Sequence, residues 1–139
     1  MTAKPNKNVL DKVRQWMAYG DEDLKLARYA LGMRQDCPYR LVAYHAQQCA
    51  EKYLKAFLVY NMQDFPYTHN ISALLELCRK HKGWPEEMAK AEELTPYAIT
   101  TRYPGEEEVV TLQEAQNAIE TAEYVKRIIR ESLHPVIAE

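Results

Sequence analysis

The sequence lacks the features that mark several large classes of protein. It has no apolar run of about 18 residues, so we expect no membrane span. Its start, MTAKPNKN, has no apolar segment of the kind found in a secretory signal. Only four of its 139 residues are glycine, while 47% are apolar. This composition disfavours disorder and favours a helix-rich globular domain.

An excess of positive charge is also absent. With 18 basic and 20 acidic residues, the net charge is −2, which excludes the global charge of a non-specific nucleic-acid binder. Any contact with a nucleotide or RNA must therefore come from a local patch. The three cysteines, Cys37, Cys49 and Cys78, have neither a disulfide framework nor a zinc spacing. We expect reduced thiols in a cytoplasmic protein that holds no metal and no cofactor.

Apolar residues recur at helical spacing, and no stretch alternates with period two, so we expect helices and no sheet. The predicted helices span residues 9–31, 38–61, 71–82, 85–94 and 111–134. Three long and two shorter helices predict an all-α, antiparallel up-and-down helical bundle. We expect a single domain over residues 1–139, with residues 1–7 flexible.

Short signals set the helix boundaries. The expected N-caps are Asn8, Thr68 or Asn70, and Thr111, the last in a capping box with Glu114. Pro96 and Pro135 are expected to end the fourth and fifth helices, because proline has no N–H to donate. Gly20 interrupts the first helix and predicts a kink or close packing.

A polar strip flanks the apolar face of the second helix. At about 100° per residue, His45, Gln48 and Lys52 lie within roughly 60° of each other. An imidazole, an amide and an ammonium can all contact phosphate, so the strip is a candidate lining for a groove. The alternative is an ordinary boundary strip or a polar patch in a dimer interface.

Arg40 and His45 form an Arg-x4-His pair, a spacing that suggests a ribonuclease. In a regular helix, however, the two side chains point about 140° apart. They cannot easily meet at one phosphate, so we do not expect this pair to be catalytic.

Thr68, His69 and Asn70 stand at the predicted start of the third helix. Exposed N–H groups and the helix dipole make such a start receptive to anions. Thr68 and His69 are therefore candidate phosphate-binding residues, although a plain cap with a surface histidine is the simpler interpretation.

The stretch TTRYPGEEE joins the last two predicted helices. Arg102 can grip a phosphate bidentately, and Tyr103 can stack on a base or donate a hydrogen bond. Alternatively, Arg102 pairs with an acid of its own chain while Tyr103 and Pro104 pack the loop onto the bundle. No histidine follows Arg102 until His134, so no local Arg–His pair exists here.

Taken in order, AYHAQQCAEKYLKAFL, FPYTHNISALLEL, PYAITTRYPGEEE and the capped last helix resemble a HEPN domain (higher eukaryotes and prokaryotes nucleotide-binding). The resemblance covers roughly residues 16–133. It implies a helical bundle, usually homodimeric, in a bacterial or archaeal setting. It also implies a partner nucleotidyltransferase encoded by a neighbouring gene, in a pair that resembles a toxin–antitoxin module.

Many HEPN proteins are metal-independent ribonucleases that use an arginine followed four to six residues later by a histidine. Here the residues four to six positions after Arg102 are Glu106, Glu107 and Glu108, and Val109 follows them, so the group that would transfer a proton is missing. The sequence therefore favours a non-catalytic protein that binds a nucleotide or RNA phosphate through Arg102 and Tyr103. A ribonuclease that uses His45 or His69 and a purely structural interaction dimer remain the alternatives.

Overall fold

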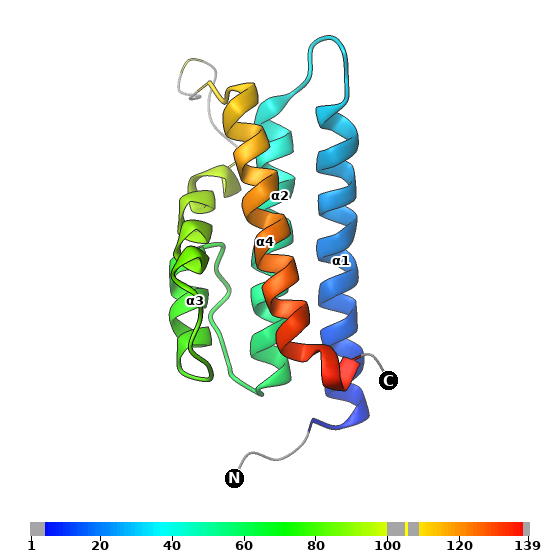
Figure 1. Ribbon diagram of the computed structural model, residues 1–139, viewed down its shortest axis with the longest axis vertical. Helices are drawn as coiled ribbons and strands as arrows, with labels where there is room; N and C mark the ends of the chain where they lie inside the picture. Colours follow the sequence, from blue (N-terminus) through cyan, green and yellow to red (C-terminus); the bar gives the residue numbers. More distant parts are fainter. Residues whose placement is uncertain (1–4, 100–104, 106–108, 138–139) are drawn as a thin grey trace.

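The structure, a computed structural model, describes residues 5–99, 105 and 109–137, with side chains up to residue 133. Within these residues the chain forms α1 (Lys7–Leu31), α2 (Tyr39–Tyr60), α3 (Ile71–Arg79), the 3₁₀ helix η1 (Glu86–Ala98) and α4 (Leu112–Ile137), and no strand. The predicted all-α bundle is confirmed. α2 and α4 run opposite to α1, and α3 and η1 pack along one side of the bundle (Figure 1).

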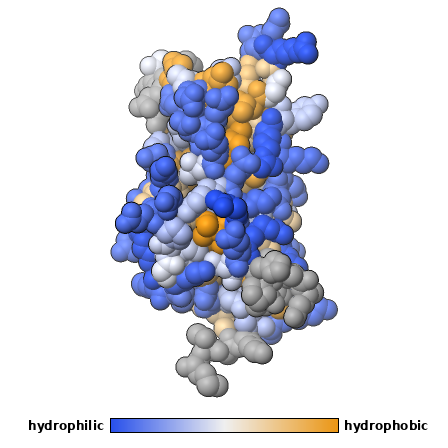
Figure 2. All heavy atoms as spheres, viewed as in Figure 1, coloured by the Kyte–Doolittle hydropathy of each residue, from blue (hydrophilic) through white to orange (hydrophobic). Residues whose placement is uncertain are grey.

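The core is centred on α2, which packs against α1, α3, η1 and α4. Apolar residues of all these helices are buried together in one cluster. The surface is mostly hydrophilic, with an apolar strip between the upper parts of α1 and α4 (Figure 2). None of the described helices is long and apolar enough to cross a membrane.

Gly20 lies at a close approach of α1 to α2. A Cβ placed there would lie 3.0 Å from the Tyr53 ring and 3.3 Å from the carbonyl oxygen of Cys49. The ring is held in place because the Tyr53 hydroxyl donates to Asp21, whose carboxylate also lies 3.0 Å from Lys126 of α4. Gly20 therefore serves close packing, one of the two roles expected for it.

Two predicted N-caps are confirmed and one is wrong. The capping box at the start of α4 forms as expected, with the Glu114 amide donating to Thr111 Oγ1 at 3.1 Å, and Asn70 caps α3. α1, however, begins two residues earlier than the predicted Val9. Asn6 caps it by accepting from the Val9 amide at 3.0 Å, which places Asn8 inside the helix.

Neither proline ends its helix. Pro96 lies inside η1, which continues to Ala98, and the Ile99 amide still donates to the Pro96 carbonyl at 3.4 Å. α4 likewise continues past Pro135 to Ile137. Both prolines stand in the last turn, where a missing N–H removes only one hydrogen bond and few further bonds depend on it.

Candidate functional site

His45 and Lys52 of α2 meet at Asp23 of α1. His45 Nδ1 lies 2.8 Å from Asp23 Oδ1, and Lys52 Nζ donates to Asp23 Oδ2. The Asp23 side chain is only 12% exposed, so these contacts are partly shielded from water. The structure thus brings two of the three residues of the predicted strip together, but around a carboxylate that already neutralises positive charge.

Gln48, the third residue of that strip, belongs to a different arrangement. Its Nε2 donates to Gln47 Oε1 at 2.7 Å, and Gln47 Nε2 donates in turn to Glu51 Oε1 at 3.0 Å. Gln47, Gln48 and Glu51 are all buried. The Gln48 side chain is therefore buried and bonded to Gln47 of its own helix, and it does not join His45 and Lys52 at Asp23.

Glu51 is the centre of what we call the Glu51 cluster, made up of Gln47, Glu51, Lys55 and His69. Glu51 Oε2 lies 2.9 Å from Lys55 Nζ, and Oε1 lies 2.8 Å from His69 Nδ1. Burial disfavours the charged carboxylate. Hydrogen bonds from Gln47, Lys55 and His69 outweigh burial and hold the pKa of Glu51 below its usual value.

Lys55 contacts aromatic rings both of the bundle and of the loop between α2 and α3. Its ammonium lies 5.4 Å from the ring centroid of Trp16 on α1. It also lies 5.9 Å from the Phe65 ring and 6.0 Å from the Tyr67 ring, both in the loop. Such cation–π contacts are attractive, and they hold the loop that carries His69 close to α2.

The loop ends in a capped helix start. The Asn70 side chain accepts from the Ala73 amide at 3.2 Å, so Asn70 is the N-cap of α3. Thr68 Oγ1 accepts from the Asn70 amide at 3.0 Å, and Thr95 Oγ1 of η1 accepts from the Ile71 amide at 3.1 Å. Thr68 and His69 were the predicted phosphate-binding residues at this helix start. The Thr68 hydroxyl already accepts a hydrogen bond within its own turn.

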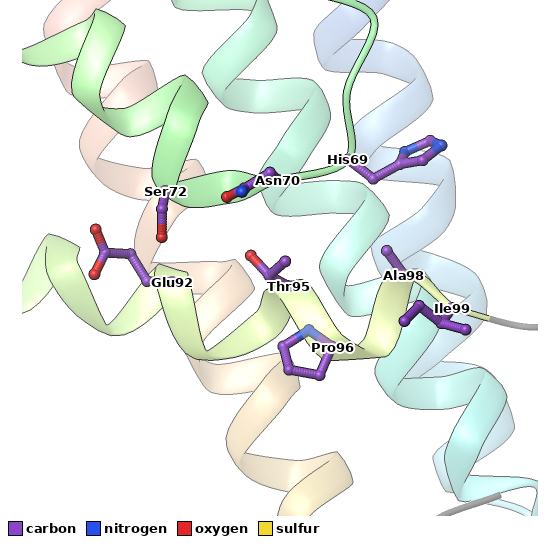
Figure 3. A pocket seen from close by; sticks show the side chains of 8 residues that line it. All are labelled: His69, Asn70, Ser72, Glu92, Thr95, Pro96, Ala98 and Ile99. Carbon is purple, nitrogen blue, oxygen red and sulfur yellow. The ribbon is translucent and has the colours of Figure 1, made fainter. Parts of the chain in front are cut away.

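A pocket of about 570 Å³ opens between the start of α3 and the end of η1. We call it the His69 pocket; its lining comprises His69, Asn70, Ser72, Glu92, Thr95, Pro96, Ala98 and Ile99. Figure 3 shows His69 close to Ala98 and Ile99 at one end, with Ser72 and Glu92 at the other. The His69 side chain is 61% exposed, although its Nδ1 and its backbone carbonyl are both bonded to α2.

Arg102 and Tyr103 lie outside the described residues. Along the chain they follow Ile99, which lines the His69 pocket, by three and four residues. In the sequence, the segment that contains them lies between Tyr97 and Glu114. The Tyr97 hydroxyl donates to Glu114 Oε2 at 3.3 Å. The predicted role of Arg102 and Tyr103 as binding residues stays a prediction.

All three cysteines are free, and Cys49 and Cys78 are buried. Burial raises the pKa of each of these two thiols to about 12, so both remain protonated and unreactive at neutral pH. Among the residues that the structure describes, no group of three or more possible ligands is placed to hold a metal ion.

The sequence prediction did not include four residues that organise the site: Asp23, Gln47, Glu51 and Lys55. A signal for two of them was present, because Glu51 and Lys55 stand four residues apart on a helix, where opposite charges pair. Asp23 gave no such signal. Its partners lie 22 and 29 residues away in sequence and meet it only through the packing of α1 on α2.

Two solved structures are similar to this chain over most of its length. The chain is similar to TT1696 from Thermus thermophilus, with 28% identity and a TM-score of 0.74 over 86% of this chain and 97% of that one. It is also similar to ST0689, described as an archaeal HEPN homologue, with 26% identity and a TM-score of 0.70 over 87% of this chain and 97% of that one. No curated protein matches the chain.

A family model, the HEPN domain, matches residues 13–132. This range includes every described residue of the Glu51 cluster, the Asp23 contacts and the His69 pocket. The chain belongs to the HEPN domain family.

Proposed function

We propose that this HEPN protein binds the phosphate of a nucleotide or of RNA at the His69 pocket, without cleaving it. The observation that carries the proposal is His69 itself. This histidine is fixed to α2 through Nδ1 and its carbonyl, yet its ring stands at the mouth of a pocket. With Nδ1 bonded to Glu51, Nε2 is the ring nitrogen left for a ligand, and it donates to a phosphate oxygen in the imidazolium form of the ring.

The surroundings of His69 suit an anion better than those of His45 and Lys52. The His69 pocket lies at the start of α3, where the helix dipole favours negative charge. A phosphate that approached His45 and Lys52 would compete with the Asp23 carboxylate, which bonds both side chains. At the His69 pocket, Glu51 bonds only Nδ1 of His69, and Glu92 lies at the other end of the lining (Figure 3). Arg102 and Tyr103 follow closely in sequence and would add a bidentate contact and a stacking ring.

Isothermal titration with ATP, GTP and a short single-stranded RNA tests the proposal. We expect wild type to bind at least one of these ligands, and His69→Ala and Arg102→Ala each to weaken binding by about tenfold, the loss of one charge-assisted contact. His81→Ala is the matched control, since His81 is exposed and lies outside the His69 pocket, with its Nε2 2.9 Å from the Gln63 side chain. The proposal would be wrong if wild type gave no heat of binding with any of the three ligands, or if all three variants bound with equal affinity.

We further propose that the protein forms a homodimer and pairs with a nucleotidyltransferase in a toxin–antitoxin-like module. Exposed apolar side chains on α1 and just after it support an association surface: Tyr19, Leu26, Tyr29 and Met33. Sedimentation equilibrium should give a dimer that Leu26→Glu converts to monomer. A wild-type monomer at all concentrations would contradict the homodimer, and failure to co-purify with a nucleotidyltransferase encoded next to it would contradict the pairing.

The contact between Asp23 and His45 favours one second candidate, a metal-independent ribonuclease. A carboxylate on Nδ1 fixes the ring orientation and leaves Nε2 to accept a proton, as a general base requires. In that case RNA cleavage in the presence of a chelator should disappear in both His45→Ala and Arg102→Ala. Absence of cleavage at high protein concentration would remove this candidate and leave the binding proposal intact.

A further inference from the structure

A second pocket, of about 450 Å³, lies at the opposite end of α3, where the chain turns into η1. It shares no lining residue with the His69 pocket. Two cationic side chains, Arg79 and Lys82, line it together with the indole of Trp84 and the apolar side chains of Pro85 and Met88. We call it the Trp84 pocket.

Trp84 carries an unsatisfied donor. Its Nε1 is buried and has no hydrogen-bond acceptor in the described part of the chain. The ring itself is held in place, because it packs edge-on against Phe57 with centroids 4.8 Å apart. A buried N–H without an acceptor is destabilising and uncommon in folded proteins, so an acceptor supplied by a ligand would be favourable.

Positive charge covers this indole. Lys82 Nζ lies 5.4 Å from the Trp84 ring centroid and donates to Ser132 Oγ at 2.8 Å. Arg79 pairs only loosely with Glu92, at 3.8 Å between exposed side chains. Glu86 also lines the pocket and is the one opposing charge among its lining residues. The lining side chains therefore carry two positive charges and one negative charge, while the C-terminal end of α3 adds negative potential.

The rim of the pocket leaves space for a ligand. Apart from its chain neighbours Lys82 and Trp84, no described residue has an atom within 4 Å of the position that a Cβ on Gly83 would occupy. The Lys82 side chain above the indole is a flexible four-carbon stem, which can swing aside without moving the backbone. Because Trp84 Nε1 is buried, an incoming oxygen reaches it only when side chains around the indole move.

We propose that the Trp84 pocket binds a small organic phosphate monoester. The phosphate contacts Lys82 and Arg79 and accepts from Trp84 Nε1–H, and its apolar body lies against Pro85 and Met88. The inference is separate from the proposed binding of nucleotide or RNA at His69, since it concerns other residues at the other end of α3.

Trp84 can report on its own pocket. The sequence has two tryptophans, so Trp16→Phe leaves Trp84 as the only indole fluorophore. In this variant we expect a saturable change in fluorescence with phenyl phosphate, a weaker one with inorganic phosphate and none with phenol. Lys82→Met, which keeps the apolar stem and removes the charge, should weaken phenyl phosphate binding by about tenfold.

The matched control is Lys90→Met, which removes the same charge from an exposed position on η1 outside the Trp84 pocket. It should leave the affinity unchanged. Calorimetry on Trp84→Phe, which keeps a ring but removes the N–H, should show weaker binding without a lower melting temperature. No saturable change in the Trp16→Phe variant, or equal losses in Lys82→Met and Lys90→Met, would overturn the proposal.

Discussion

At the scale of single residues, Glu51 decides how the candidate site is built. Its side chain is only 3% exposed, and the donors that surround it come from Gln47 and Lys55 on α2 and from His69 in the following loop. A buried carboxylate is tolerated only when it is paired and hydrogen-bonded in this way. Glu51 therefore fixes the orientation of His69 as well as contributing to stability.

Glu51→Ala should destabilise the fold by about 3–5 kcal/mol, because it leaves the Lys55 ammonium buried without its partner. Urea unfolding followed by circular dichroism measures this change. Glu76→Ala, at an exposed position of α3, is the control and should change stability by less than about 0.5 kcal/mol. A comparable loss in both variants would show that the Glu51 cluster has no special role.

The stability that Glu51 provides should depend on pH in a defined direction. Its pKa in the folded protein is lower than its usual value of 4.5, so its contribution is complete above that pH. The contribution is lost as the pH falls through the folded-state pKa. The stability difference between wild type and Glu51→Gln should therefore narrow on acidification below 4.5, and a difference that stays constant would contradict the assigned pKa shift.

At the scale of helices, the contact of α1 with α2 depends on a missing side chain at Gly20. Gly20→Ala gains about 1 kcal/mol in helix propensity. The new methyl group, however, meets the Tyr53 ring at 3.0 Å, and such overpacking costs about 1–3 kcal/mol. We expect the free energy of unfolding to fall by up to about 2 kcal/mol, which thermal unfolding measures.

Gly83→Ala is the control for that substitution, because open space surrounds the position and no clash follows. It should leave the melting temperature unchanged or raise it slightly. If Gly20→Ala proved as stable as Gly83→Ala, the close contact at Tyr53 would not limit how α1 packs on α2.

The helices could be predicted from the sequence because their signals are local. The capping box of Thr111 and Glu114 needs only four residues, and it forms as expected. Asn6 was missed because Asn8 offers an equal capping side chain two residues later. The helix end at Pro96 was misplaced because 3₁₀ geometry carries η1 through the proline.

The candidate site was predictable only in part, because most of its contacts join residues that are far apart in the sequence. His69 was identified from its position at a helix start, which is a local feature. Its bond to Glu51 joins residues 18 apart in sequence, and the contacts of Asp23 span still longer separations. Such pairs arise from the packing of helices, which helical periodicity alone does not specify.

At the scale of the whole molecule, the topology brings three segments to one place. The middle of α2, the loop before α3 and the end of η1 meet around His69, and the segment with Arg102 begins directly after η1. The Asp23 contacts lie instead between α1 and α2. The two groups of polar residues on α2 thus belong to separate surfaces, and only one of them borders the His69 pocket.

The most direct test is to locate a bound RNA on the folded protein. A short single-stranded RNA titrated into nitrogen-labelled protein should shift the backbone amide resonances of His69, Ser72, Thr95 and Ile99 in a saturable way. The amides around Asp23 and Lys52 should stay in place. Shifts confined to the Asp23 surface, or no shifts at all, would contradict phosphate binding at His69.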